Sequence, residues 1–548
     1  MSRSGLIAAT GLLPQTGGWV YAKRGRPGIP VTRWLRYIEW GRRFGALRDE
    51  LPGMSRSRTH AMSTVSVPTA EPLPRVDFAS ANDPALLLAL QREAFRQTKV
   101  TTLDDRLADL EKLRRAIKRN TQRIAAVISN DFGNRSRQET LLAEIWPVLV
   151  AIRHTKKHLA EWMKPKKVPV AFELRGGRAH ILHQPVGIVG IMSPWNYPFQ
   201  LAIMPLVAAL AAGNRILLKP SELTPHTSQF LAEFLGQLFA PNKVATVLGG
   251  PEVGSAFARL PFDHLFFTGS TAVGRLVMQA AAENLTPVTL ELGGKTPCIL
   301  AEDAVLAKAA ESIVSGKLLN AGQTCIAPDY VLLPQARCEE FIGLLSKKVK
   351  AFYPSLKSNP DYTAIINDHH YQRVRRYLDE AKAKGARLIE LNPAQEELTA
   401  QDRKLAPTLV IEPDEDLALM REEIFAPVLP IKSYTHIEEA VAFVNRRPRP
   451  LALYYFGVDQ AARDELLRQT VSGGVSVNET LMHILVDDLP FGGIGASGMG
   501  AYHGLAGFET FSHRKGVFVQ GRFSAARFLR PPFGFVSKAM LKMLISRS

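Results

Sequence analysis

The stretch Val186-Gly-Ile-Val-Gly-Ile-Met192 is an unbroken apolar run without a charged residue, which is typical of a strand buried on both faces. It opens a region in which expected strands and helices alternate up to residue 292. The further strands are expected at 215–219, 244–248, 264–267 and 288–292, and the helices at 199–212, 224–239, 251–260 and 272–283. Strict alternation predicts right-handed crossovers and a parallel sheet covered by helices on both faces.

Polar residues follow three of these strands at the points where the strands end. They are Ser193-Pro-Trp-Asn-Tyr-Pro198, Lys219-Pro-Ser-Glu222 and Thr268-Gly-Ser-Thr-Ala-Val-Gly274. Parallel sheets bind ligands at the carboxyl ends of their strands, and the third sequence leads into a helix whose first N–H groups can bind a pyrophosphate. Glu222 could accept hydrogen bonds from a ribose. The alternative for Lys219 and Glu222 is an ordinary charge pair at a helix start.

Residues 293–480 predict a second α/β domain, and this domain contains Asn320-Ala-Gly-Gln-Thr-Cys-Ile-Ala-Pro328. That sequence lies between an expected helix at 304–319 and an expected strand at 330–333. Cys325 is therefore expected in a tight connection, where Gly322 permits close approach of the backbone. The thiol is a candidate nucleophile. The alternative is a small buried apolar side chain, which is what most free cysteines are.

Cysteine content and charge distribution restrict the class of protein. Three cysteines among 548 residues give no disulfide framework and suit a reducing compartment, so a cytoplasmic location is expected. The net charge is +17, but residues 1–75 carry 12 Lys and Arg against 4 Asp and Glu, and residues 514–548 carry 8 against none. Because the rest of the chain is close to neutral, a nucleic-acid partner is not expected.

The two ends of the chain lack the pattern of the central region. Residues 1–75 predict a basic extension that is disordered or precedes the true start near Met54 or Met62; a weak signal peptide and a mitochondrial transit peptide are the alternatives. The apolar run at 533–545 is too short to span a bilayer, so no integral membrane segment is expected. This run could lie on a membrane surface or, as we favour, at a subunit interface.

Six motifs, taken together, resemble those of one protein family. They are Pro194-Trp-Asn-Tyr-Pro198, Lys219-Pro-Ser-Glu222, Phe267-Thr-Gly-Ser270, Leu290-Glu-Leu-Gly-Gly-Lys295, Gly322-Gln-Thr-Cys325 and Glu422-Glu-Ile-Phe425. In this order they make the chain similar to the aldehyde dehydrogenase superfamily over roughly residues 83–515. The sequences that begin at Gln323 and Leu489 are most similar to its class 3 branch and, within that branch, to bacterial coniferyl aldehyde dehydrogenases.

The resemblance implies an α/β fold with a Rossmann-like, parallel-sheet cofactor domain, a second α/β catalytic domain and a small β element for oligomerisation. Residues 76–292 would bind NAD(P), with a β-hairpin at 166–185 for oligomerisation. Residues 293–480 would form the catalytic domain. Residues 481–548 would bridge subunits and end in a basic tail. A homodimer is the assembly that the resemblance implies.

The resemblance also implies a chemical role for three residues. Cys325 would attack an aldehyde carbonyl, and the Asn196 side-chain amide, with the backbone N–H of Cys325, would hold the oxyanion. Glu291 would activate the water that hydrolyses the resulting thioester. An acid in an apolar strand can also be a buried, paired structural group, and this alternative remains open for Glu291.

The cofactor implied by the resemblance is NAD, with NADP used less well, and no metal is expected. The implied contacts are Lys219 and Glu222 at the adenosine ribose, Gly269, Ser270 and Gly274 around the pyrophosphate, and Glu423 and Phe425 at the nicotinamide ribose. One residue departs from the family pattern: Ala426 stands where the family usually has glycine. If that position requires a positive φ, alanine costs about 1 kcal/mol or more and weakens cofactor binding.

The implied substrate is an apolar, aromatic, coniferyl-type aldehyde, and the alternative is an aliphatic aldehyde of medium or long chain. Two other classes of function are the alternatives to an aldehyde dehydrogenase. A thiol hydrolase would employ Cys325 without a redox step, and a silent binding protein would need none of Asn196, Glu291 and Cys325. Aldehyde-dependent reduction of NAD distinguishes an aldehyde dehydrogenase from both of these classes.

Overall fold

The computed structural model describes residues 83–548, except 99, 172–173, 175, 523 and 548. The basic extension expected at 1–75 therefore lies outside the described residues. In the part of the chain that the structure describes, no helix is both long enough and apolar enough to cross a bilayer.

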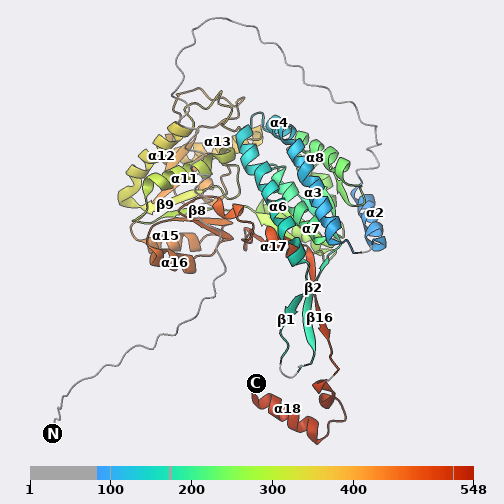
Figure 1. The fold of residues 1–548 in the computed structure, drawn as a ribbon. Coiled ribbons are helices and arrows are strands. Elements are labelled where there is room, and N and C mark those ends of the chain that lie inside the picture. Colours follow the sequence, from blue (N-terminus) through green and yellow to red (C-terminus); the bar gives the residue numbers. More distant parts are fainter. Residues whose placement is uncertain (1–82, 99, 172–173, 175, 523, 548) are drawn as a thin grey trace, which may run out of the picture. The chain divides into compact units, whose positions relative to one another are not determined.

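The first sheet runs in the order β15-β7-β6-β3-β4-β5, and residues 188–292, which form most of it, are drawn in shades of green in Figure 1. Its strands are β3 (Ile188–Met192), β4 (Arg215–Lys219), β5 (Val244–Thr246), β6 (His264–Gly269), β7 (Val288–Leu292) and β15 (Gly498–Met499). Strands β3 to β7 are parallel, as predicted. The chain adds β4 and β5 on one side of β3 and then β6 and β7 on the other, so the switch in strand order lies at β3. The sequence did not predict β15, which pairs antiparallel with β7.

Helices connect these strands and bury them. They are α7 (Gln200–Ala212), α8 (Pro225–Leu238), α9 (Pro251–Ala258) and α10 (Thr271–Ala282). Every residue of α7 is buried, because this helix contacts both the sheet and the helices outside it. An apolar helix of this kind is stable only inside a large core. It fixes the segment before it, which carries Asn196.

The second sheet runs in the order β10-β11-β12-β9-β8-β13-β14. Its strands are β8 (Pro297–Leu300), β9 (Tyr330–Pro334), β10 (Arg387–Glu390), β11 (Thr408–Ile411), β12 (Val428–Tyr434), β13 (Ala452–Phe456) and β14 (Gly474–Val477). Its helices are α11 (Leu306–Leu318), α12 (Cys338–Phe352), α13 (Asp368–Ala383), α14 (Ala418–Arg421), α15 (Ile437–Asn445) and α16 (Gln460–Gln469). All neighbours are parallel except β10 with β11. The predicted α/β fold is therefore confirmed.

The helices before the first sheet contact it either directly or through α7 and α8. They are α2 (Pro84–Gln97), α3 (Leu103–Arg119), α4 (Thr121–Phe132), α5 (Arg137–Thr140) and α6 (Trp146–Trp162). Asp83 accepts hydrogen bonds from the N–H groups of Ala85 and Leu86, and Pro84 is the first helical residue, which is a favourable helix start. Between α5 and α6 the chain forms a π-helical turn, Leu141–Ile145. Such turns are rare and often lie at functional sites.

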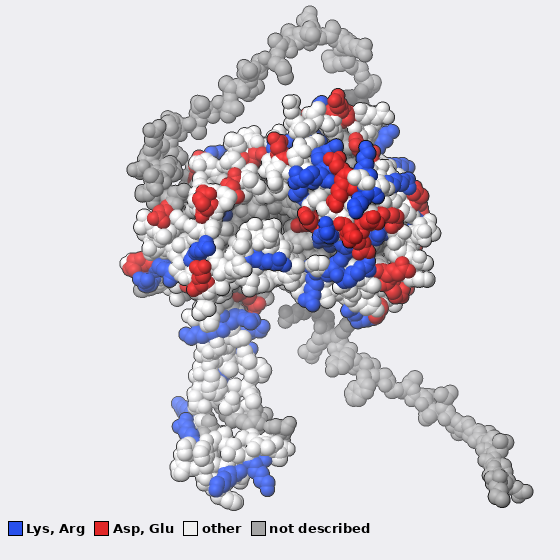
Figure 2. Space-filling view, turned by 180° about the vertical axis from the view of Figure 1, so that it is seen from behind, with Lys and Arg blue, Asp and Glu red and all other residues white. Residues whose placement is uncertain are grey.

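A small antiparallel sheet pairs the segment after α6 with a segment near the C-terminus (Figure 1). It consists of β1 (Lys166–Val168), β2 (Arg178–Pro185) and β16 (Ser512–Val519), with β2 in the middle. The sequence predicted the first two strands and missed β16. After β16 the chain forms a short 3₁₀ turn and then helix α18 (Phe535–Arg547). In Figure 2 the part that β16 and α18 build shows Lys and Arg among uncharged residues, in keeping with a segment without acids.

Candidate active site

The loop that carries Cys325 has an unusual backbone. After α11 the chain forms a 3₁₀ turn, Leu319–Gly322, in which Asn320, Ala321 and Gly322 have φ of 54°, 51° and 77°. A Cβ on Gly322 would lie 2.5 Å from the carbonyl oxygen of Ala426, so the close approach predicted for this glycine is confirmed. Left-handed backbone at two residues other than glycine costs free energy. The surrounding contacts must therefore hold this turn in place.

Cys325 and Glu291 line the same cavity, whose volume is about 190 Å³. Most of the other side chains around it are apolar or aromatic. They include Trp146, Leu201, Met204, Ile484, Phe491 and Tyr502. The cavity is therefore a small, mostly apolar chamber whose wall also holds the Cys325 thiol, the carboxylic acids of Glu291 and Asp487, and His503. A mostly apolar wall with a few polar groups is the form of a site for an apolar ligand.

Burial and two nearby acids determine the pKa of the Cys325 thiol. Burial, followed by the negative charge of Glu423 and then of Glu291, raises the pKa of this thiol to about 12. The backbone N–H groups of Cys325 and Ile326 act in the opposite direction. The thiol is therefore protonated at neutral pH in this state, and it needs a proton acceptor before it can act as a nucleophile.

Both acids are themselves held in low-dielectric surroundings. Glu291 is 3 % exposed, and neither of its carboxylate oxygens has a hydrogen-bond partner among the described residues. Burial raises the pKa of Glu291 well above its usual value. Burial, with the charge of Asp329, raises the pKa of Glu423 to about 8. A carboxylate with a raised pKa is a stronger base when it ionises. No cation among the described residues pairs with Glu291, which speaks against the purely structural alternative for this acid.

Asn196 lies against the Cys325 loop without lining the cavity. Its side-chain Nδ2 donates to the carbonyl oxygen of Gln323 at 3.1 Å. The neighbouring Tyr197 hydroxyl shares a hydrogen bond of 2.6 Å with Thr324. The Asn196 amide therefore contacts the Cys325 loop at Gln323, two residues before Cys325.

The carboxyl ends of the first sheet form a second polar region. Lys219 ends β4, and its ammonium lies 2.8 Å from the carboxylate of Glu222. Gly269 ends β6, and Ser270 caps α10 by accepting from the N–H of Val273. Because β4 and β6 both flank β3, these two groups face the same edge of the sheet. A Cβ on Gly274 would lie 2.6 Å from Leu292, which gives this glycine a packing reason of its own.

This edge fits a dinucleotide by a further observation. The buried hydroxyls of Ser193, Thr246 and Thr268 follow or end β3, β5 and β6, and none has a hydrogen-bond partner among the described residues. Buried hydroxyls without partners are uncommon in folded proteins. A ligand rich in oxygen atoms, such as two linked nucleotides, would supply the missing partners.

The segment with Glu423 and Phe425 is anchored by residues that the sequence analysis did not single out. Lys295 donates to the carbonyls of Leu419 and Glu422, and Arg373 donates to that of Ile424. A Cβ on Gly293 would overlap the Glu423 carboxylate. The positive φ in this segment belongs to Phe425, at 54°, and not to Ala426. The departure at Ala426 therefore carries no backbone strain, so the expected weakening of cofactor binding loses its basis.

No group of three or more His, Cys, Asp or Glu side chains suited to a metal ion occurs among the described residues. The described residues thus form a site with one candidate nucleophile, one buried and one half-buried acid, one amide donor and a polar edge for a dinucleotide. A two-sheet α/β fold with these features is that of a dinucleotide-dependent oxidoreductase.

Comparison with known proteins assigns the family. The profile of the "Aldehyde dehydrogenase family" matches residues 54–517. The "Probable coniferyl aldehyde dehydrogenase" of Pseudomonas aeruginosa is 49% identical over 84% of this chain and 96% of its own length. The "Aldehyde dehydrogenase, dimeric NADP-preferring" of Rattus norvegicus is 40% identical over 78% and 93%. The chain therefore belongs to the aldehyde dehydrogenase family and is an NAD(P)-dependent aldehyde dehydrogenase.

A solved structure agrees with this assignment. The chain in "Substrate bound state of Staphylococcus Aureus AldH" superposes with a TM-score of 0.79 and is 38% identical, over 84% of this chain and 99% of that one. The family match begins at residue 54, inside the region expected to be an extension.

Proposed function

We propose that this enzyme oxidises an apolar aromatic aldehyde, of the coniferyl type, to the carboxylic acid through a thioester on Cys325. The observation that carries the proposal is the shared cavity: Cys325 and Glu291 open into one chamber whose other walls are mostly apolar and aromatic. The thiol needs an acceptor for its proton, which water can supply, and the thioester later needs a base for water, which an acid in the same chamber can be.

The first step is attack of the Cys325 sulfur on the aldehyde carbon. The thiol proton passes to water in the chamber. The carbonyl oxygen becomes an oxyanion, and the Nδ2 group of Asn196 and the backbone N–H of Cys325 are the proposed donors to it. The hydrogen bond of Asn196 to Gln323 supports this role, because it holds the amide at the loop that carries the thiol.

When bound, NAD(P)⁺ supplies the acceptor for the hydride that leaves the tetrahedral carbon. Lys219 and Glu222 would bind the adenosine ribose, Gly269 and Ser270 would face the pyrophosphate, and Glu423 and Phe425 would contact the nicotinamide ribose. The pair of Lys219 and Glu222 supports a preference for NAD, because the carboxylate repels a 2′-phosphate. Gly274 is a weaker candidate for cofactor contact, since packing on Leu292 accounts for it.

The last step releases the acid. Glu291, once ionised, takes a proton from water, and the resulting hydroxide attacks the thioester carbon while the bond to the Cys325 sulfur breaks. The absence of any hydrogen-bond partner for the Glu291 carboxylate within the described residues supports this role, because a free acceptor can bind water.

Aromatic walls favour an aromatic aldehyde over an aliphatic one. Trp146, Phe491 and Tyr502 line the chamber, and aromatic rings pack on one another with specific geometry and added stability. A panel of cinnamyl, benzyl and long aliphatic aldehydes, followed by NADH absorbance, tests this. We expect the highest kcat/KM with the cinnamyl aldehyde. A higher kcat/KM with a long aliphatic aldehyde would favour the alternative substrate class.

We also propose a homodimer in the cytoplasm. Val168, Phe518 and Val519 are apolar and exposed on β1 and β16, the two edge strands of the small sheet. Exposed edges of this kind pair with another chain, and a relative of this chain is named dimeric. The three cysteines are free, as suits a reducing compartment.

A further inference from the structure

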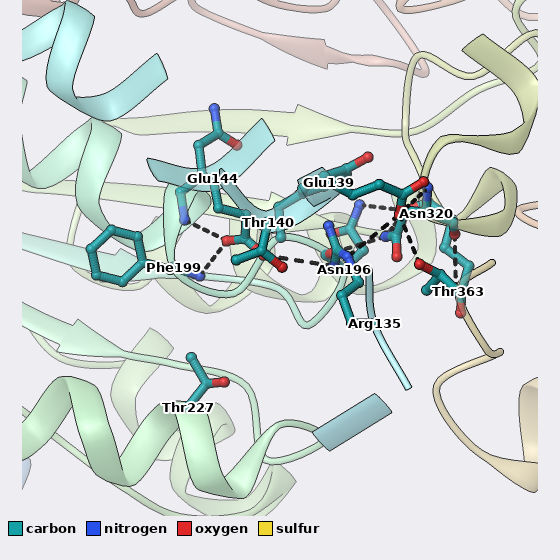
Figure 3. Close-up of polar contacts among 12 residues, drawn as sticks. Arg135, Glu139, Thr140, Glu144, Asn196, Phe199, Thr227, Asn320 and Thr363 are labelled. Atoms are coloured by element: carbon teal, nitrogen blue, oxygen red, sulfur yellow. Dashed lines mark hydrogen bonds and ion pairs between the residues drawn. The ribbon is translucent and has the colours of Figure 1, made fainter. Parts of the chain in front are cut away.

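A cluster of buried ionic side chains contacts the segments that carry Asn196 and Asn320 (Figure 3). The guanidinium of Arg135, whose side chain is fully buried, lies 3.6 Å from Glu144 and 4.0 Å from Glu139. It also lies over the rings of Phe132 and Tyr197. A buried charge is costly unless it is paired and hydrogen-bonded. The cluster is therefore under a strong constraint, since loss of any member leaves another buried charge without its partner.

Arg135 and Asn320 both bind the backbone of Asn196. The Nη1 group of Arg135 donates to the Asn196 carbonyl oxygen at 2.9 Å, and so does the Nδ2 group of Asn320. Asn320 Nδ2 also donates to the Gln323 carbonyl at 3.0 Å. The peptide of Asn196 is thus tied to the loop before Cys325 by its backbone as well as by its side chain.

Glu139 holds the left-handed turn at its first residue, Asn320. Its Oε2 atom accepts from the backbone N–H of Asn320 at 3.1 Å and from the hydroxyl of Thr363 at 2.7 Å. Asn320 is the first of the residues with positive φ before Cys325. A charged acceptor on this N–H favours the turn over extended alternatives.

Glu144 holds the other loop. Its Oε2 atom accepts from the backbone N–H groups of Phe199 and Gln200, each at 2.9 Å. These groups start α7, which has no side-chain cap of its own. Glu144 therefore fixes the start of the helix that follows Asn196.

The π-helical turn explains how two acids five residues apart reach one arginine. Residues five apart in an α-helix point about 140° away from each other around the axis. A turn with i→i+5 hydrogen bonds brings such residues closer to one face. Glu139 precedes the turn Leu141–Ile145 and Glu144 lies within it, so this turn lets both carboxylates face Arg135.

We propose that Arg135, Glu139 and Glu144 are positioning residues that lock the Asn196 loop and the Asn320–Cys325 loop together, so that the oxyanion donor and the thiol meet at one aldehyde carbonyl. This inference rests on the roles proposed above for Asn196 and Cys325. The three side chains touch neither substrate nor cofactor in this role. They act on the reaction through the two loops.

Glu139→Ala tests the proposal, because it removes the acceptor of the Asn320 N–H. The rate of the first-turnover NADH burst should fall about ten- to a hundredfold, as expected for a small misplacement of reacting groups. The dissociation constant for NAD, measured by fluorescence titration, should stay within about twofold of wild type. Hydrogen exchange of the peptide around Asn320, measured without cofactor, should become faster.

Two further variants separate positioning from general stability. Glu139→Gln keeps an oxygen acceptor for the Asn320 N–H and should recover most of the burst rate. Gln91→Ala removes a buried side chain whose two hydrogen bonds go to the carbonyls of Ile216 and Pro241 and to neither loop. It should lower the unfolding temperature and leave the burst rate unchanged.

A wild-type burst rate in Glu139→Ala, with a lower unfolding temperature as in Gln91→Ala, would overturn the proposal. If Glu139→Ala does not fold, Thr363→Val removes one hydrogen bond to the same carboxylate, and an unchanged burst and unchanged exchange in it would have the same meaning. Cys325→Ser separates failure of the proposed function: a normal burst there rejects the catalytic role of Cys325 whatever the Glu139 variants show.

Discussion

In their ionised form, Glu291 and Glu423 raise the pKa of the Cys325 thiol. Burial in turn raises the pKa of each of these two acids. Each acid therefore favours its neutral form near the thiol, and a neutral acid does not oppose formation of the thiolate by charge. The same shift makes each carboxylate a better proton acceptor once it is ionised. The proposed division of work gives Glu291 the water and Glu423 the nicotinamide ribose.

Glu291→Gln should separate the two halves of the reaction. Glutamine keeps the shape of the side chain but cannot take a proton from water, so attack and hydride transfer should proceed while release of the acid slows. Stopped-flow absorbance should show a burst of about one NADH per active site followed by a slow steady rate.

Cys325→Ser is the control for this experiment, because it should lose the burst as well as the steady rate. Full steady-state activity in Glu291→Gln would exclude Glu291 as the base.

Glu222→Gln should change the choice of cofactor. The carboxylate opposes a 2′-phosphate and Lys219 attracts one, so removing the negative charge leaves the attraction. A difference of about 1–2 kcal/mol corresponds to a rise of about 5- to 30-fold in the ratio of kcat/KM with NADP to kcat/KM with NAD. Steady-state kinetics with both cofactors measure it.

Glu233→Gln is a matched control on α8, since Glu233 pairs with Arg123 on the surface and should leave the ratio unchanged. A ratio that does not rise in Glu222→Gln would return Glu222 to the role of an ordinary partner of Lys219.

At the level of elements, the turn before Cys325 depends on one glycine and two residues of other types. Gly322 could be recognised from the sequence because glycine readily adopts positive φ and permits close approach. Asn320 could not be, because the groups that hold it, the Glu139 carboxylate on α5 and the Asn196 carbonyl, lie far away in the sequence. Nothing in the local sequence marks Ala321. The local sequence thus predicted where the turn lies but not how it is held.

Gly322→Ala should disrupt this turn. Alanine at φ 77° costs about 1–2 kcal/mol, and its Cβ would lie 2.5 Å from the Ala426 carbonyl oxygen. We expect a lower unfolding temperature by calorimetry and a large loss of kcat.

Gly343→Ala is the matched control on α12. A Cβ there meets nothing within 4 Å, so it should keep full activity and raise stability by about 0.5–1 kcal/mol. Normal activity in Gly322→Ala would mean that the loop tolerates another path.

At the scale of the whole molecule, the small sheet made of β1, β2 and β16 has two edge strands, each of which pairs on one side only among the described residues. Its edge strands expose Val168, Phe518 and Val519. The proposed dimer would cover these edges and remove unpaired backbone groups from solvent.

Phe518→Lys should therefore weaken the dimer. A charged side chain in an apolar interface loses its hydration, so the variant should shift toward monomer in light scattering at low protein concentration. Val458→Lys, at an exposed apolar residue after β13, is the control and should leave the mass unchanged. An unchanged mass in Phe518→Lys would place the interface elsewhere.

The sequence by itself determined the parallel sheet, because each strand and helix there has a local apolar pattern that needs no distant partner to be recognised. It also determined the position of Cys325 in a tight turn and the order of the motifs that led to the family. The roles of the cofactor residues remain predictions.

Only the tertiary structure decided how the site is held. β15 and β16 form by pairing with strands far away in the sequence, and Gly498-Met499 has no strand pattern of its own. Arg135, Glu139 and Glu144 read as ordinary charges on helices, and their role follows from burial against loops about 60 and about 180 residues further along the chain. A local pattern records which face of an element is apolar. It does not record which distant polar groups that element meets, because long-range packing alone decides those contacts.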